Sequence, residues 1–68
     1  MVNVEKLKYK VKEKGMNVEG LAEAMGIDRS TLYRKLQKRG EDISIREASL
    51  IVEKLELSES EAVAIFFN

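Results

Sequence analysis

Several residue types that commonly build functional sites are missing from this sequence. It has no cysteine and no histidine, so we expect no disulfide and no ordinary zinc site. It also has no glycine-rich phosphate loop and no obvious pair of catalytic carboxylates. Because most nucleophilic and acid–base chemistry depends on such groups, the sequence predicts a protein that is not an enzyme. We predict no cofactor, no metal and no small-molecule effector.

Long apolar runs are absent as well. No segment approaches the roughly 20 apolar residues that cross a membrane, and the N-terminal residues lack the basic region and apolar core of a signal peptide. We therefore expect a cytoplasmic protein without a membrane partner. The 68 residues allow one domain at most, residues 1–68, which packing, helix caps and oligomerisation must stabilise.

Charge is balanced over the whole chain but not along it. The 12 basic and 12 acidic residues give a net charge of zero. Residues 28–40 nevertheless contain five basic side chains and one acidic one, whereas residues 41–68 contain two basic and seven acidic ones. A basic segment is typical of a nucleic-acid contact. The alternative is that lysine and arginine only keep one helix face in water, which is common.

Proline is absent, and leucine, alanine, glutamate and lysine are frequent, which favours helix. One start signal recurs: a polar cap residue follows an apolar residue, and another apolar residue comes four positions after the cap. The caps are Asn3, Asn17, Asp28, Ser44 and Ser58. Glu47 and Glu61 lie three positions after the two serines and complete capping boxes. The sequence thus predicts an all-α fold with helices at 4–14, 18–25, 29–38, 45–55 and 59–67.

The second and third predicted helices are joined by only three residues, Gly26, Ile27 and Asp28. A short connection that contains glycine is typical of a helix-turn-helix. We expect Gly26 to adopt a positive φ angle, Ile27 to fill the corner and Asp28 to cap the third helix. Apolar residues at helical spacing predict the core. They are Leu7, Val11, Leu21, Ala22, Met25, Leu32, Leu36, Ala48, Ile51, Leu55, Ala62, Ile65 and Phe66.

Residues 17–36, NVEGLAEAMGIDRSTLYRKL, resemble the helix-turn-helix of the Cro/CI-like repressor family, also called the XRE family. Residues 14–16, 43–48 and 55–58 are similar to that family too, so the resemblance extends over nearly the whole chain. It implies a compact five-helix, lambda-repressor-like DNA-binding domain whose helix-turn-helix consists of helices two and three. Two positions depart from the family: Val18 stands where many relatives have glutamine, and Gly20 where an acidic residue is usual.

The resemblance implies that the third helix, about 29–38, lies in the major groove while the second helix braces it. The first exposed residues of that helix are candidates for base contacts: Arg29, Ser30, Tyr33 and Arg34. An arginine can donate to O6 and N7 of guanine together, and a tyrosine can pack on a thymine methyl group or bond a phosphate. Alternatively, the two arginines contact phosphate or remain solvated.

Other polar residues are candidates for phosphate contacts, which fix the register of a protein on DNA but carry no sequence information. They are Asn17, Thr31, Lys35, Lys38 and Arg39. Asn17 begins the second helix, whose free backbone N–H groups form a partially positive end that suits a phosphate.

The last predicted helix contains more apolar side chains than one monomer face can bury. Val63, Ile65, Phe66 and Phe67 are therefore candidates for a dimer interface. The resembling family commonly forms a dimer contact in this region, which would demand a palindromic DNA site. The alternative is that Phe66 and Phe67 close the monomer core.

The sequence therefore predicts a homodimeric transcriptional regulator that binds double-stranded DNA sequence-specifically. We expect it to be a repressor of phage, prophage or bacterial type. Repression follows from size, because an operator-bound domain blocks polymerase by occupancy. The competing hypothesis is a helix-turn-helix-derived protein-interaction module or an antitoxin-like partner protein. The zero net charge and Val18 favour that alternative, whereas the basic cluster between Arg29 and Arg39 argues against it.

Overall fold

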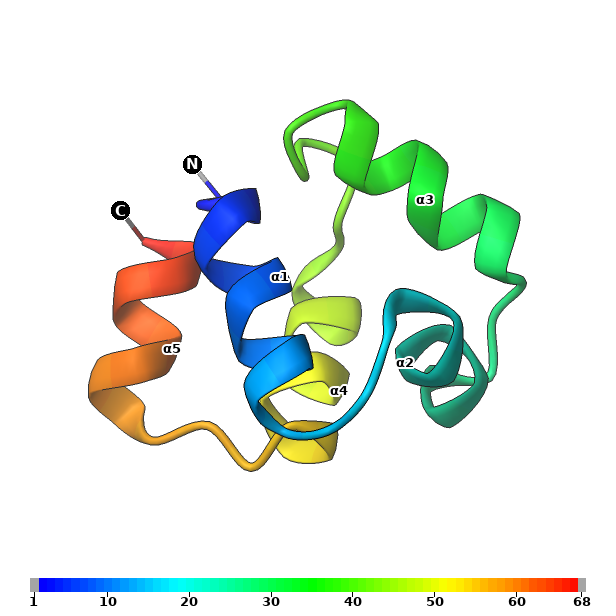
Figure 1. Ribbon diagram of the computed structural model, residues 1–68. Helices are drawn as coiled ribbons and strands as arrows, with labels where there is room; N and C mark the ends of the chain where they lie inside the picture. The colour runs from blue at the N-terminus through cyan, green and yellow to red at the C-terminus, as the bar shows by residue number, and fades with distance from the viewer. Residues whose placement is uncertain (1, 68) are drawn as a thin grey trace.

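The computed structural model describes residues 2–67, which form five α-helices (Figure 1). They are α1 (Val4–Glu13), α2 (Val18–Met25), α3 (Arg29–Gln37), α4 (Ile45–Lys54) and α5 (Glu59–Phe66). All five predicted helices are confirmed, and each begins at the predicted residue. Four of them end one residue earlier than predicted. The residue that follows each of these four is a C-cap, whose N–H still bonds the last turn.

The helix starts are fixed by the predicted caps. Each cap side chain accepts a backbone N–H from the first turn of its helix, as seen at Asn3, Asn17, Asp28, Ser44 and Ser58. Both capping boxes are complete, since the N–H of Ser44 donates to Glu47 at 2.9 Å and that of Ser58 donates to Glu61 at 2.8 Å. Each such cap contributes about 1 kcal/mol to helix stability.

One apolar core joins all five helices within a body of 28 × 24 × 20 Å. Its buried members are Leu7, Val11, Leu21, Ala22, Met25, Leu32, Leu36, Ile51, Leu55, Leu57 and Ile65. The other predicted core residues, Ala48, Ala62 and Phe66, are half-buried around it, as is Ile27, which was predicted to fill the corner between α2 and α3. In Figure 1, α4 lies in the middle, with α1 and α5 on one side and α2 and α3 on the other.

The two ends of the described chain are joined to each other. The N–H of Asn3 donates to the carbonyl of Ile65 at 2.7 Å, and α1 lies beside α5 (Figure 1). Where α1 ends and α5 begins, the ammonium of Lys10 bonds the carboxylates of Glu13 and Glu61. These carboxylates raise the pKa of Lys10. The hydrogen bond from Lys10, with that from the Ser58 N–H, lowers the pKa of Glu61 to about 2.

The turn between α2 and α3 has the predicted geometry. Gly26 is left-handed, with φ +77°, and Ile27, half-buried against the core, donates its N–H to the carbonyl of Ala22 at 3.0 Å. Asp28 then accepts the N–H of Ser30 at 3.2 Å and starts α3. The sharp turn therefore sets α3 at a fixed angle to α2, with its outer side free.

Candidate nucleic-acid interface

The outer side of α3 presents the four side chains that the sequence nominated for base contacts. Leu32 and Leu36 face the core and are buried. Arg29, Ser30, Tyr33 and Arg34 are exposed. Their spacing of one and four residues places them on one side of the helix, away from the two leucines. A helix of this length with a polar outer side has the dimensions that a major groove admits.

Arg29, at the start of α3, is held by a residue of α2. Its Nη1 lies 2.7 Å from Oε2 of Glu19, and the two side chains are 63% and 58% exposed. Arg34, one turn further along α3, is exposed and has no ion pair within residues 2–67. Among the described residues, α3 thus presents one paired and one unpaired guanidinium at the same surface.

Lys35 does not point freely at solvent. Its side chain is only 19% exposed, its Nζ donates to the carbonyl of Asp42 at 3.0 Å, and it lies 3.3 Å from Glu47. The pKa of Glu47 is lowered chiefly by the N–H of Ser44 and also by Lys35. Lys35 therefore ties α3 to the loop and to the start of α4, a position unlike the phosphate contact expected from the sequence.

The remaining cations at the end of α3 lie at the surface. Lys38 is 60% exposed and 3.4 Å from Asp42. Arg39 is exposed and has a positive φ of 60°, in the tight turn before Gly40. Thr31 is half-buried. The structure thus leaves Lys38 and Arg39 available at one end of α3 and gives Thr31 less access.

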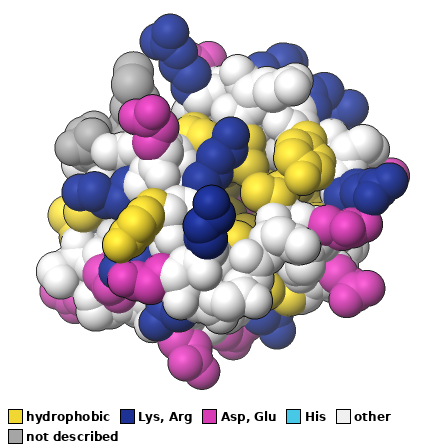
Figure 2. Space-filling model, viewed as in Figure 1, with side chains coloured by type: hydrophobic (Ala, Val, Ile, Leu, Met, Phe, Trp, Pro, Cys, Tyr) yellow, Lys and Arg dark blue, Asp and Glu magenta, His cyan; other side chains and the backbone are white. Residues whose placement is uncertain are grey.

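A shallow hollow of about 220 Å³ lies at the start of α2, where the sequence predicted a phosphate seat. Lys8, Lys12, Val11, Met16, Asn17, Val18 and Tyr33 line it. Figure 2 shows Lys and Arg side chains over α1 and along the edge formed by α3, with hydrophobic atoms in the hollow between. The rim of this hollow therefore combines a helix N-terminus, two lysines and a tyrosine, and such groups suit a phosphate.

Lys8 and Lys12 were not singled out from the sequence. Lysine occupies every second position from Lys6 to Lys14, so composition alone does not separate them. Their spacing of four puts Lys8 and Lys12 on one side of a helix, but Lys6, Lys10 and Lys14 have the same spacing. Only the packing of α1 beside α2 reveals that this side borders Asn17.

The two departures from the resembling family also have structural reasons. Val18 is half-buried against the core, so its side chain packs instead of reaching outward. A Cβ on Gly20 would lie 3.2 Å from Oδ1 of Asn17, which accepts the Gly20 N–H at 2.7 Å. Gly20 therefore leaves room for the side chain that caps α2.

A comparison with family models decides what kind of domain this is. The model described as the Cro/C1-type HTH DNA-binding domain matches residues 6–63. The chain belongs to the Cro/C1-type helix-turn-helix family. The matched range runs from the first turn of α1 into α5 and includes the whole of α2, the turn and α3. No curated protein and no solved structure matches the chain.

Membership in the Cro/C1-type family agrees with the resemblance seen in residues 17–36 and makes the chain a DNA-binding transcription regulator with double-stranded DNA as its partner. Within residues 2–67, no group of acidic side chains is arranged to hold a metal ion. None of the helices in that range has the length and apolar character needed to span a membrane.

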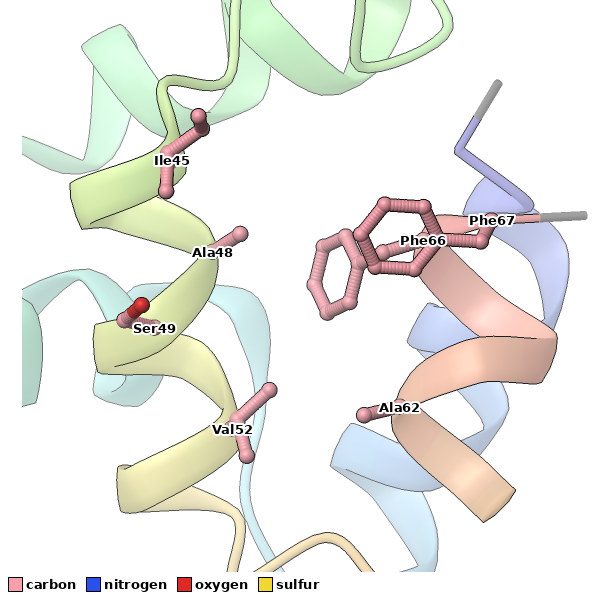
Figure 3. A pocket seen from close by; sticks show the side chains of 7 residues that line it. All are labelled: Ile45, Ala48, Ser49, Val52, Ala62, Phe66 and Phe67. Carbon is pink, nitrogen blue, oxygen red and sulfur yellow. The ribbon is translucent and has the colours of Figure 1, made fainter. Parts of the chain in front are cut away.

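A second surface feature of this Cro/C1-type domain lies away from α3. An open apolar groove of about 280 Å³ runs between α4 and α5 (Figure 3). It is lined by Ile45, Ala48, Ser49, Val52, Ala62, Phe66 and Phe67. Ile45 and Phe67 are 88% and 79% exposed. Figure 3 shows the two phenylalanine rings standing beside the groove, opposite α4.

The four predicted interface residues of α5 divide between core and surface. Ile65 is fully buried, so its assignment to an interface was wrong; it belongs to the core, where the sequence also placed it. Helical periodicity explains the division, because Ala62, Ile65 and Phe66 lie on the inner side of α5. Val63 and Phe67 are exposed, and half-buried Phe66 both packs against the core and lines the groove. Ile45, the first residue of α4, was missed.

Proposed function

We propose that residues 1–68 form a single domain that binds double-stranded DNA sequence-specifically and represses transcription as a phage, prophage or bacterial regulator. The observation that carries this proposal is the outer side of α3, where Arg29, Ser30, Tyr33 and Arg34 are exposed on a braced helix. In the proposed complex, α3 lies in the major groove. Arg29 and Arg34 donate to guanine O6 and N7, while Ser30 and Tyr33 contact neighbouring base edges.

Phosphate contacts on both sides of α3 would fix the docking angle. Beside the middle of α3, where Tyr33 lies, Asn17, Lys8 and Lys12 border the hollow at the start of α2. At the end of α3, Lys38 and Arg39 are exposed. Thr31 also lies on α3, half-buried. Phosphate contacts at two places along a recognition helix hold it along the groove and add affinity that depends on salt.

The proposed unit on DNA is a homodimer at a palindromic operator, and the α4–α5 groove supports this. Its lining contains no charged side chain, so two copies can bring it together without burying a charge. Phe67 of each copy, 79% exposed beside its own groove, is a suitable occupant for the groove of the other. A two-fold dimer sets its recognition helices about one DNA turn (~34 Å) apart.

Repression needs nothing beyond occupancy, because a bound dimer covers the DNA that polymerase must reach. The proposed target places the protein in the cytoplasm. In this scheme, neither an effector nor a catalytic step is required, and the amount of protein sets the occupancy of the operator.

Selection from random-sequence duplex DNA tests this proposal. We expect enrichment of a two-fold-related motif and an affinity that falls steeply with salt, as counterions are released from contacted phosphates. Weak, salt-sensitive binding with no enriched motif would contradict base reading. That outcome would favour the protein-interaction or antitoxin-like alternative, to be pursued by seeking a protein partner for α5.

A further inference from the structure

We propose that Glu19 determines specificity by positioning Arg29. The inference rests on the proposed function, since it concerns how α3 reads DNA. Glu19 lies in the first turn of α2, ten residues before Arg29, and its Oε2 accepts from Nη1 of Arg29 at 2.7 Å. The pair therefore bridges the brace helix and the recognition helix at the end where base contacts begin.

The pair contributes little to folding. Both side chains are more than half exposed, and ion pairs of this kind have a median effect near zero because water and salt screen them. The turn between α2 and α3 is already held by Gly26, by the N–H of Ile27 and by the Asp28 cap. What the bridge does change is the freedom of the Arg29 side chain at the protein surface.

The chemistry of arginine makes that restriction useful. A guanidinium carries five N–H donors in a rigid plane, and Glu19 engages only Nη1. The remaining donors keep a fixed direction and can meet O6 and N7 of one guanine. Val18, the first residue of α2, packs against the core. Glu19 is thus the residue of the first turn of α2 that reaches Arg29.

The negative charge of Glu19 also helps the protein to discriminate against the wrong DNA sequence. In a complex with the wrong sequence, an unrestrained arginine finds a nearby phosphate and retains affinity. A carboxylate beside it competes with phosphate for the guanidinium and is itself repelled by the DNA backbone. Glu19 therefore lowers affinity for non-cognate DNA more than for the site in which Arg29 meets its guanine.

Glu19→Gln tests the inference, because it removes the charge at nearly constant size. We expect non-specific affinity to rise about threefold or more, and preference for the selected base at the Arg29 position to fall about fivefold or more. In the Arg29→Ala background, Glu19→Gln should leave base preference unchanged. Circular dichroism and urea unfolding should be close to wild type for every variant.

The matched control is Glu23→Gln. Glu23 is an exposed residue of the same helix, one turn beyond Glu19 on the same side, and forms no ion pair among the described residues. It should raise affinity through charge alone and leave base preference intact. If Glu19→Gln behaves as Glu23→Gln does while wild type reads a motif, the inference is overturned and the proposed function stands. If wild type prefers no base at any position, both the inference and the proposed function are wrong.

Discussion

The ammonium of Lys35 in α3 lies 3.3 Å from the carboxylate of Glu47, which also completes the capping box of α4. This contact joins the recognition helix to the first turn of α4. We predict that Lys35→Met destabilises the protein by about 1 kcal/mol, since Glu47 and the carbonyl of Asp42 lose a donor. Urea unfolding followed by circular dichroism measures the change.

The same variant distinguishes a structural lysine from a phosphate contact. Lys35→Met should leave the salt dependence of DNA binding unchanged, whereas Lys38→Ala should reduce the slope by about 1. Lys38 is the suitable comparison because it is 60% exposed on the same helix. A reduced slope and full stability for Lys35→Met would show that Lys35 contacts phosphate after all.

Gly26 sets the angle between α2 and α3 through its positive φ of +77°. Gly26→Ala places a Cβ in the left-handed region, and we expect it to lose about 1–2 kcal/mol of unfolding free energy. Gly26→Asn should lose less, because asparagine tolerates this conformation better. Equal stability of the alanine variant and wild type in urea would mean that the turn relaxes to another geometry.

Stability should depend on pH through Glu61. Its pKa in the folded protein is about 2, below the ordinary value of 4.5, so its stabilisation is full above pH 4.5 and is lost as pH falls from there toward 2. We predict that Glu61→Gln is less stable than wild type at pH 7 and that this difference shrinks in acid. Gln retains an oxygen that can accept the Ser58 N–H.

Thermal unfolding between pH 7 and pH 2.5 measures this difference. Glu59→Gln is the control, because Glu59 lies in the same turn of α5 and forms no ion pair within residues 2–67. A Glu61→Gln curve parallel to wild type over this range would disprove the role assigned to the Lys10 bridge.

Self-association should depend on Phe67. Phe67→Ser removes the exposed ring beside the α4–α5 groove, and we expect it to weaken dimerisation about tenfold or more. Sedimentation equilibrium, with and without the selected duplex, provides the measurement. Tyr9→Ser serves as control, because Tyr9 is 64% exposed on α1 and does not line the groove. Equal effects of the two changes would exclude a specific contact.

Local rules predicted the fold well and the site only in part. Caps and staples are read from residues within one helical turn, so the starts of all five helices could be placed from the sequence. Two features of the site could not be predicted, because they depend on how helices distant in sequence pack. Lys35 lies beside Glu47, and Lys8 lines the same hollow as Asn17. The place of Ile65 could not be predicted for the same reason. The apolar spacing in α5 fits either a core or an interface position, and only the packing of α5 against α1 shows that Ile65 is buried.

The most direct test of the central claim, that α3 reads bases, compares the motifs selected by wild type, Arg29→Ala and Lys38→Ala at one fixed salt concentration. We predict that Arg29→Ala loses preference at one position in each half-site and keeps the rest of the motif. Lys38→Ala should bind more weakly with the motif unchanged. An Arg29→Ala motif identical to wild type at every position would contradict the claim.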